Sequence, residues 1–143
     1  MPSGKTHEAA TLLVLTPAAG YLYLHDPLLA AGVALGAVAS FWVNPDLDLA
    51  SSRPSRRWGP LSALWGPYRL LFPHRSASHS WLVGPLSRLL YLALPFFAAE
   101  KLGLELPPVL LPKEVLVGAL GGWLASEWLH LALDKIPPWR LVK

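Results

Sequence analysis

The segment His74-Arg75-Ser76-Ala77-Ser78-His79-Ser80 is a short polar stretch between two apolar parts of the chain. Pro73 precedes it, and a long hydrophobic run begins at Trp81. Two of the five histidines of the protein lie within it. Titratable side chains are rarely packed this densely beside an apolar helix unless something binds them. We therefore interpret this segment as part of a binding site, to which other polar segments contribute.

The other unusual polar residues also lie next to apolar runs. They are the early His7, the pair Asp46 and Asp48, and the late pair His130 and Asp134. In an extended loop, Asp46 and Asp48 would point the same way, whereas a spacing of four places His130 and Asp134 on one face of a helix. Because the chain has no cysteine, a metal here must use histidine, carboxylate, backbone or water ligands.

Together these residues predict a divalent metal centre, with Zn²⁺ as the first expectation and Mn²⁺ or Fe²⁺ as alternatives. If the protein is an enzyme, we expect metal-activated water to attack a phosphoester or acyl bond. Glu127 is the candidate for proton transfer or ligand orientation, and Arg75 or Arg57 would bind an anion. The predicted metal ligands are His7, Asp46, Asp48, His74, His79, His130 and Asp134.

The composition indicates an apolar, helical protein. Of the 143 residues 53% are hydrophobic and 15% are charged, against about 25% charged in ordinary soluble proteins. Apolar runs cover residues 9–24, 28–43, 81–99 and 115–133, and Pro17 should kink or break the first of them. We predict one all-α domain, 1–143, with four apolar helices in a membrane-associated bundle and ligand-bearing loops on one side.

The basic residues predict an orientation for this bundle. If all four runs cross a membrane, the N-terminus, residues 44–80 and the C-terminus share one side, and only Lys101 and Lys113 among the basic residues fall on the other. The positive-inside rule then places the N-terminus and the metal site on the cytoplasmic side of the inner membrane. We expect membrane lipid as a partner and a lipid-linked or phosphorylated substrate. Arginines interleaved with aromatic residues in 51–72 fit the headgroup level better than a nucleic-acid surface, so no nucleic acid is expected.

In chain order, these motifs resemble a prokaryotic family of uncharacterised metal-binding proteins. The resemblance covers nearly the whole chain and rests on six segments: Ser3–His7, Pro45–Asp48, Arg57–Gly59, Trp65–Tyr68, His74–Ser80 and the late His130-x-x-x-Asp134. More distantly, the pattern resembles LexA-binding, inner-membrane-associated proteins described as metal-dependent hydrolases. The resemblance implies a helical membrane protein with a metal site. Leu49 stands where the distant relatives often carry a further histidine.

Three alternatives stay open at this point. A metal-independent lipid phosphatase with a histidine nucleophile would need a Ser-Arg pair upstream of His130, where Leu124 and Ala125 stand. A membrane scaffold or partner-binding protein with a structural metal site is the main non-enzymatic alternative. A soluble helical bundle is the third, because runs 9–24 and 28–43 are shorter than the roughly twenty residues that span a bilayer.

Overall fold

The computed structural model describes residues 3–74, 76–105, 107–108 and 110–139. Within these residues it contains helices and irregular segments without a β-strand, which confirms the predicted all-α fold. The elements in chain order are α1 (Gly4–Tyr23), α2 (Pro27–Ala39), the 3₁₀ turn η1 (Pro45–Asp48), α3 (Arg53–Arg57), η2 (Gly59–Trp65), α4 (Gly66–Leu71), η3 (Ala77–His79), α5 (Val83–Lys101) and α6 (Lys113–Leu133).

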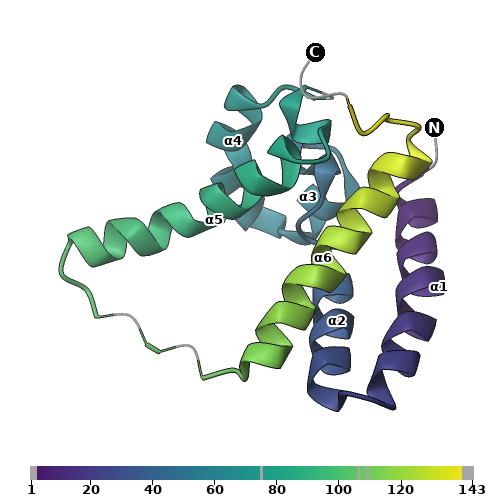
Figure 1. Ribbon diagram of the computed structural model, residues 1–143. Helices are drawn as coiled ribbons and strands as arrows, with labels where there is room; N and C mark the ends of the chain where they lie inside the picture. The colour runs from purple at the N-terminus through teal and green to yellow at the C-terminus, as the bar shows by residue number, and fades with distance from the viewer. Residues whose placement is uncertain (1–2, 75, 106, 109, 140–143) are drawn as a thin grey trace.

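The helices α1 and α2 form an antiparallel hairpin (Figure 1). Ser3 caps α1, and Asp26 caps α2 through a 2.9 Å hydrogen bond from Leu29 N–H. Pro17 lies inside α1 without ending it, so of the two outcomes predicted for it, a kink or a break, the break does not occur. A proline removes one backbone hydrogen bond, and packing of α1 against α2 and α6 keeps the helix together.

Glycines set the distance between α2 and α6. A Cβ added at Gly36 would lie 2.0 Å from the backbone oxygen of Ala119, and one at Gly118 would lie 2.4 Å from a backbone oxygen of α2. Gly32 and Gly122 meet the facing backbone in the same way. These small residues therefore let the backbones of α2 and α6 approach each other closely.

The short elements between α2 and α5 form a small core of their own. Leu47, Trp65 and Tyr68 are buried together. Arg69 ties the segment together by donating from Nε to the Leu47 carbonyl oxygen at 3.0 Å and from Nη2 to Ser55 Oγ at 3.1 Å. Because Leu47 belongs to η1, this core fixes η1 and with it Asp46 and Asp48.

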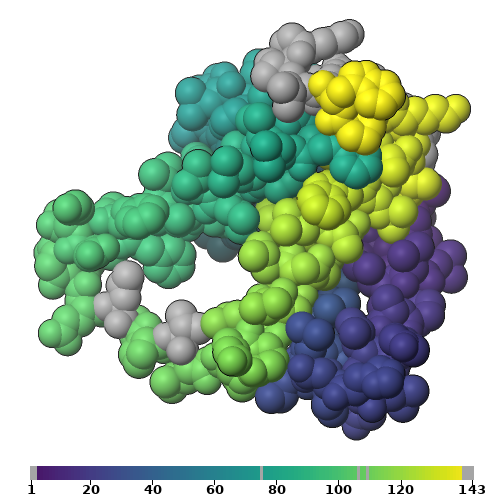
Figure 2. All heavy atoms as spheres, viewed as in Figure 1, coloured from purple at the N-terminus to yellow at the C-terminus, as the bar shows by residue number. Residues whose placement is uncertain are grey.

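The outer part of α5 diverges from α6, and the space-filling view shows an opening between them (Figure 2). Leu90, Leu94, Phe96 and Phe97 are exposed on this helix. By length and composition, one helix among the described residues, Lys113–Leu133, qualifies to cross a membrane, and 39% of its most apolar window is buried inside the protein. The shorter helix α2 is also apolar. Membrane association of the four predicted runs therefore stays a prediction.

Candidate metal centre

One end of the bundle gathers ionisable side chains from distant parts of the chain. They come from the first turns of α1, from η1, from η3 and the segment before it, and from the C-terminal end of α6. In each of three groups, ligand atoms from three residues lie within 4.8 Å of one another. The groups are His7, His130 and Asp134; Asp46, His79 and His130; and Asp48, His74 and His79.

The turn η1 replaces the extended loop that the sequence predicted for the two aspartates. The Asn44 side chain accepts the Asp46 N–H at 3.0 Å and so caps the turn that Pro45 begins. Residues two apart in a 3₁₀ helix are separated by about 240° around its axis. Asp46 and Asp48 therefore do not point the same way, and they reach His79 from different sides.

The imidazole of His79 lies between these two carboxylates and is 1% exposed. Its Nδ1 is 3.1 Å from Asp48 Oδ2, and its Nε2 is 3.9 Å from Asp46 Oδ1. Ser78 Oγ donates to Asp48 Oδ2 at 2.6 Å. A proton on Nδ1 shared with Asp48 leaves the Nε2 lone pair free for a metal, the usual arrangement of a ligating histidine.

The second half of the cluster is formed by α1 and α6. His130 Nε2 lies 3.5 Å from Asp46 Oδ1 and 3.6 Å from Asp134 Oδ2, while His7 Nε2 lies 3.2 Å from Asp134 Oδ1. The rings of His7 and His130 are stacked, with centroids 3.8 Å apart. Among the described residues, Nε2 of His79 and Nε2 of His130 are buried without a hydrogen-bond partner. Buried polar atoms are normally satisfied, so these two nitrogens fit a bound cation.

The charge states of the cluster also suit a cation. Burial alone would raise the pKa of Asp46, but the neighbouring imidazole of His130, together with the charges of His79 and His7, holds that pKa below its ordinary value. The pKa of Asp48 is likewise lowered, because contacts with His79 outweigh burial. Burial lowers the pKa of His7, and nearby His130 acts in the same direction. Charged carboxylates and a neutral imidazole are the forms that metal binding requires.

The cluster is closed on one side and accessible on the other. The side chains of His7, His130 and Asp134 are at most 7% exposed, whereas that of Asp46 is 22% exposed. His74, 34% exposed, reaches the cluster only at its edge, where Nδ1 lies 2.7 Å from Asp48 Oδ1. Solvent therefore reaches the centre past Asp46.

The comparisons with known proteins identify a metal-binding family. A family model described as "Uncharacterized metal-binding protein (DUF2227)" matches residues 2–116. The chain belongs to this family. An uncharacterised protein of Aquifex aeolicus (strain VF5) is 32% identical over 119 residues, which cover 69% of this chain and 84% of the relative. No solved structure matches.

Membership of DUF2227 confirms the predicted resemblance to uncharacterised metal-binding proteins. The more distant likeness to LexA-binding hydrolases finds no support in these comparisons. The family match ends at residue 116, so His130 and Asp134 lie beyond it. The tertiary structure brings these two residues to the five predicted ligands that lie within the match.

Glu127, a predicted catalytic residue, is fully buried behind the cluster of this DUF2227 protein. Its Oε2 pairs with Nη2 of Arg88 from α5, and Arg88 Nη1 donates to the Ser78 carbonyl oxygen at 3.0 Å. Arg88 thus joins α5, η3 and α6 beside His79, a role that our sequence analysis missed. A lone arginine within an apolar run was the signal for it. Arg75, the other predicted catalytic residue, lies outside the described residues.

Proposed function

We propose that this protein binds a divalent cation between η1, η3 and the end of α6. One observation carries the proposal: the buried, unpartnered Nε2 atoms of His79 and His130 lie 3.9 and 3.5 Å from the same oxygen, Asp46 Oδ1. A single cation would satisfy all three atoms. Asp134 and His7 extend the donor set on the α1 side.

The three ligand groups do not contribute equally to this proposal. His79 belongs both to the group with Asp46 and to the group with Asp48. These two groups can hold separate ions only if both ring nitrogens of His79 are ligands. If His79 Nδ1 donates to Asp48 instead, Asp48 orients the ring, and His74 hydrogen-bonds to the orienting carboxylate. We infer that Asp46, His79, His130, Asp134 and His7 are ligands and that Asp48 and His74 act as positioning residues.

We infer that the protein uses this cation to hydrolyse a phosphoester or acyl bond. A divalent ion held by these residues, with Zn²⁺ favoured and Mn²⁺ or Fe²⁺ as alternatives, would supply Lewis acidity and lower the pKa of a water molecule at the site. The partly exposed Asp46 supports the inference, because a purely structural site is usually closed by protein ligands whereas a catalytic site keeps an open position. A substrate would reach the centre along this open side.

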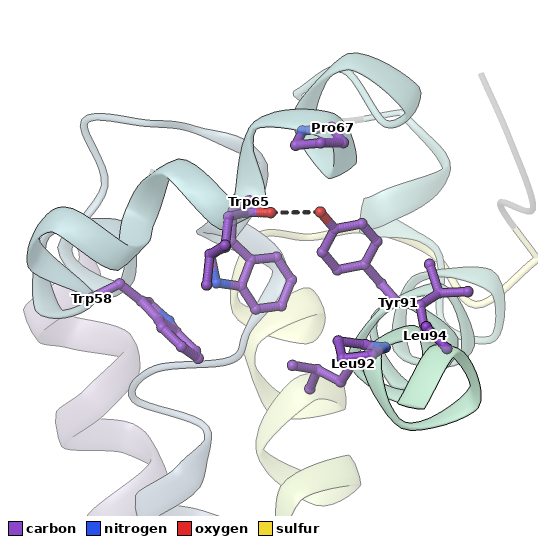
Figure 3. Close-up of a pocket in the computed structure, with 9 residues that line it drawn as sticks. Trp58, Trp65, Pro67, Tyr91, Leu92 and Leu94 are labelled. Atoms are coloured by element: carbon purple, nitrogen blue, oxygen red, sulfur yellow. Dashed lines mark hydrogen bonds between the residues drawn. The ribbon is translucent and has the colours of Figure 1, made fainter. Parts of the chain in front are cut away.

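We further propose that the apolar part of the bundle lies in the inner membrane, with the metal centre on the cytoplasmic side. Large apolar side chains such as Leu13 and Phe97 are exposed on the long helices, and within the described part of the chain no long helix packs extensively against α5. An apolar cavity of about 450 Å³ lies beside α5, between Trp58, Trp65 and Tyr91, whose hydroxyl donates to the Leu64 carbonyl oxygen (Figure 3). Its lining is suited to hydrocarbon, as the expected lipid partner requires.

Metal content tests the first proposal. Elemental analysis would compare the purified parent with His79→Ala and Asp134→Ala, and with His25→Ala as a matched control. His25 is exposed in the turn between α1 and α2, so its loss should leave the metal content unchanged. We expect near-stoichiometric metal in the parent and the control and a clear fall in both site variants. No metal in the parent, or metal unaffected by both substitutions, would overturn the proposal.

Hydrolysis and membrane insertion need separate measurements. Metal-dependent cleavage of a chromogenic phosphodiester or ester that disappears in His79→Ala would support the hydrolase proposal. A metal-loaded protein that is inactive on both substrates would favour the structural alternative.

Because the chain has no cysteine, single cysteines introduced at Ser51 and Gly103 can be labelled from outside spheroplasts to test the topology. Labelling of Gly103→Cys alone supports the proposed topology, and labelling of Ser51→Cys contradicts it.

A further inference from the structure

A second cluster of charged side chains lies beside the start of α1, apart from the metal centre. Lys5, Arg53, Arg56 and Arg57 line a cavity of about 380 Å³ that is open to solvent. Glu8 is the carboxylate that meets them, with Oε2 3.2 Å from Arg53 Nη2 and Oε1 2.6 Å from Arg57 Nη1. Four positive charges therefore face one negative charge.

The local sequence explains why these cations converge. Arg53, Arg56 and Arg57 are spaced i, i+3 and i+4 on α3, so they share one helix face. Gly4 gives Arg53 room to lie across the start of α1, because a Cβ at Gly4 would come within 3.0 Å of Arg53 Cδ. The cavity thus lies where the Arg53 side chain of α3 packs against Gly4 at the start of α1.

The donors of this cavity are only partly used. Arg57 Nη1 donates to the Phe41 carbonyl oxygen at 2.8 Å, and Arg57 Cζ lies 5.4 Å from the centroid of the Phe41 ring. Arg57 is therefore held in place as one side of the cavity. Arg53 Nη1 is buried and has no hydrogen-bond partner among the described residues. Lys5 and Arg56 are exposed and form no ion pair within the described part of the chain. Several N–H donors therefore remain for a ligand.

We propose that this cavity binds a phosphate group. Guanidinium groups match phosphate oxygens in pairs, and an ammonium adds a mobile point charge. The excess of three positive charges favours a dianion over a single carboxylate. The ligand is either a free phosphate or phosphorylated solute, or the phosphate of an anionic lipid headgroup, since both present the same oxygens.

The phosphate cavity and the metal centre lie on different sides of α1. At 3.6 residues per turn, Lys5 and His7 are separated by about 200° around the helix, and His7 and Glu8 by about 100°. A phosphate held by the arginines would therefore lie apart from His7. This inference rests on the four cations and does not depend on the proposed metal function.

Titration calorimetry with inorganic phosphate on the purified full chain tests the proposal, both as isolated and with the neutral chelator 1,10-phenanthroline. The variants are Lys5→Gln/Arg56→Gln, which removes the two exposed cations, and Lys113→Gln, a matched control with an 89% exposed side chain. We expect saturable binding that persists with the chelator and in His79→Ala, weakens about tenfold or more in the double variant, and is unchanged in Lys113→Gln.

A second arm distinguishes the two sources of phosphate. The chain is reconstituted in neutral phosphatidylcholine nanodiscs with or without phosphatidic acid and titrated with inorganic phosphate. Suppressed titration in the phosphatidic acid discs supports a lipid headgroup, and unchanged titration supports a soluble phosphate. The proposal is overturned if phosphate shows no saturable binding in the parent, if the double variant binds equally well, or if His79→Ala or the chelator abolishes binding. Metal content is measured separately, so failure here and failure of the metal proposal are distinguishable.

Discussion

His79 contacts Asp48 through one ring nitrogen and faces Asp46 with the other: Nδ1 is 3.1 Å from Asp48 Oδ2, and Nε2 is 3.9 Å from Asp46 Oδ1. The two aspartates, two residues apart in η1, therefore have different tasks. Asp48 fixes the orientation and tautomer of the ring, and Asp46 lies beside Nε2, where both can bind the proposed cation.

The first prediction separates an orienting carboxylate from a ligand. Asp48→Asn should keep the metal stoichiometry but weaken metal affinity about 10- to 100-fold, because the ring loses its charged partner. His130→Ala should instead lower the stoichiometry. Competition with a chromophoric chelator measures both quantities. Complete metal loss in Asp48→Asn, equal to that in His130→Ala, would show that Asp48 is itself a ligand.

The second prediction concerns the pH dependence of the metal-free protein. The folded-state pKa of His7 is lowered by burial, so its stabilising effect is present above the unfolded value of about 6.5 and is lost as pH falls. The lowered pKa values of Asp46 and Asp48 act in the same direction, but only below about pH 4. Thermal unfolding should therefore show stability falling from near pH 6.5 downwards.

The comparison for this pH profile is His7→Asn, which should lose the part of the decline that begins near pH 6.5 and keep the part due to the aspartates. A metal-free parent that became more stable between pH 7 and pH 5 would contradict the assignment.

The third prediction concerns the contact between α2 and α6. Gly118→Ala should destabilise the fold by about 1–3 kcal/mol or more, because its Cβ would meet a backbone oxygen at 2.4 Å and the helices would have to separate. Gly121→Ala is a close control, since among the described residues outside its own stretch of α6 no atom lies within 4 Å of its added Cβ. In denaturant unfolding, the control should be neutral or more stable by up to about 1 kcal/mol. Equal effects of the two substitutions would argue against a glycine-determined contact.

The fourth prediction concerns the buried pair of Arg88 and Glu127. Arg88→Met should cost about 3–5 kcal/mol, because it leaves an uncompensated carboxylate in the interior. Arg88→Met/Glu127→Leu should recover much of that loss, since an apolar pair of similar volume avoids the desolvation of two charges. Chemical denaturation of both variants tests this, and a double variant as unstable as the single one would contradict it.

The same two variants reveal whether the pair also supports the metal centre. Arg88 holds the Ser78 carbonyl oxygen, next to His79, so the double variant should show weakened metal affinity despite its recovered stability. If its metal affinity equals that of the parent, the pair serves the fold alone.

The sequence itself determined the helical fold and the residue types of the metal centre. Long apolar runs separated by prolines and polar turns specify helices through interactions between near neighbours. Asp26 and Pro27 stand at the start of α2, positions at which these residue types are common. The absence of cysteine and the placement of histidines and aspartates beside helix ends limited the donors to imidazole and carboxylate.

Only the tertiary structure decided how those donors meet. The 3₁₀ geometry of η1, the nitrogen of His79 that faces each aspartate, and the pairing of Arg88 with Glu127 all depend on contacts between segments far apart in sequence. The same holds for the cavity between Lys5 and the arginines of α3. Spacing along the chain fixes which side chains share a helix face, but close packing at glycines and the burial of charge select which faces meet.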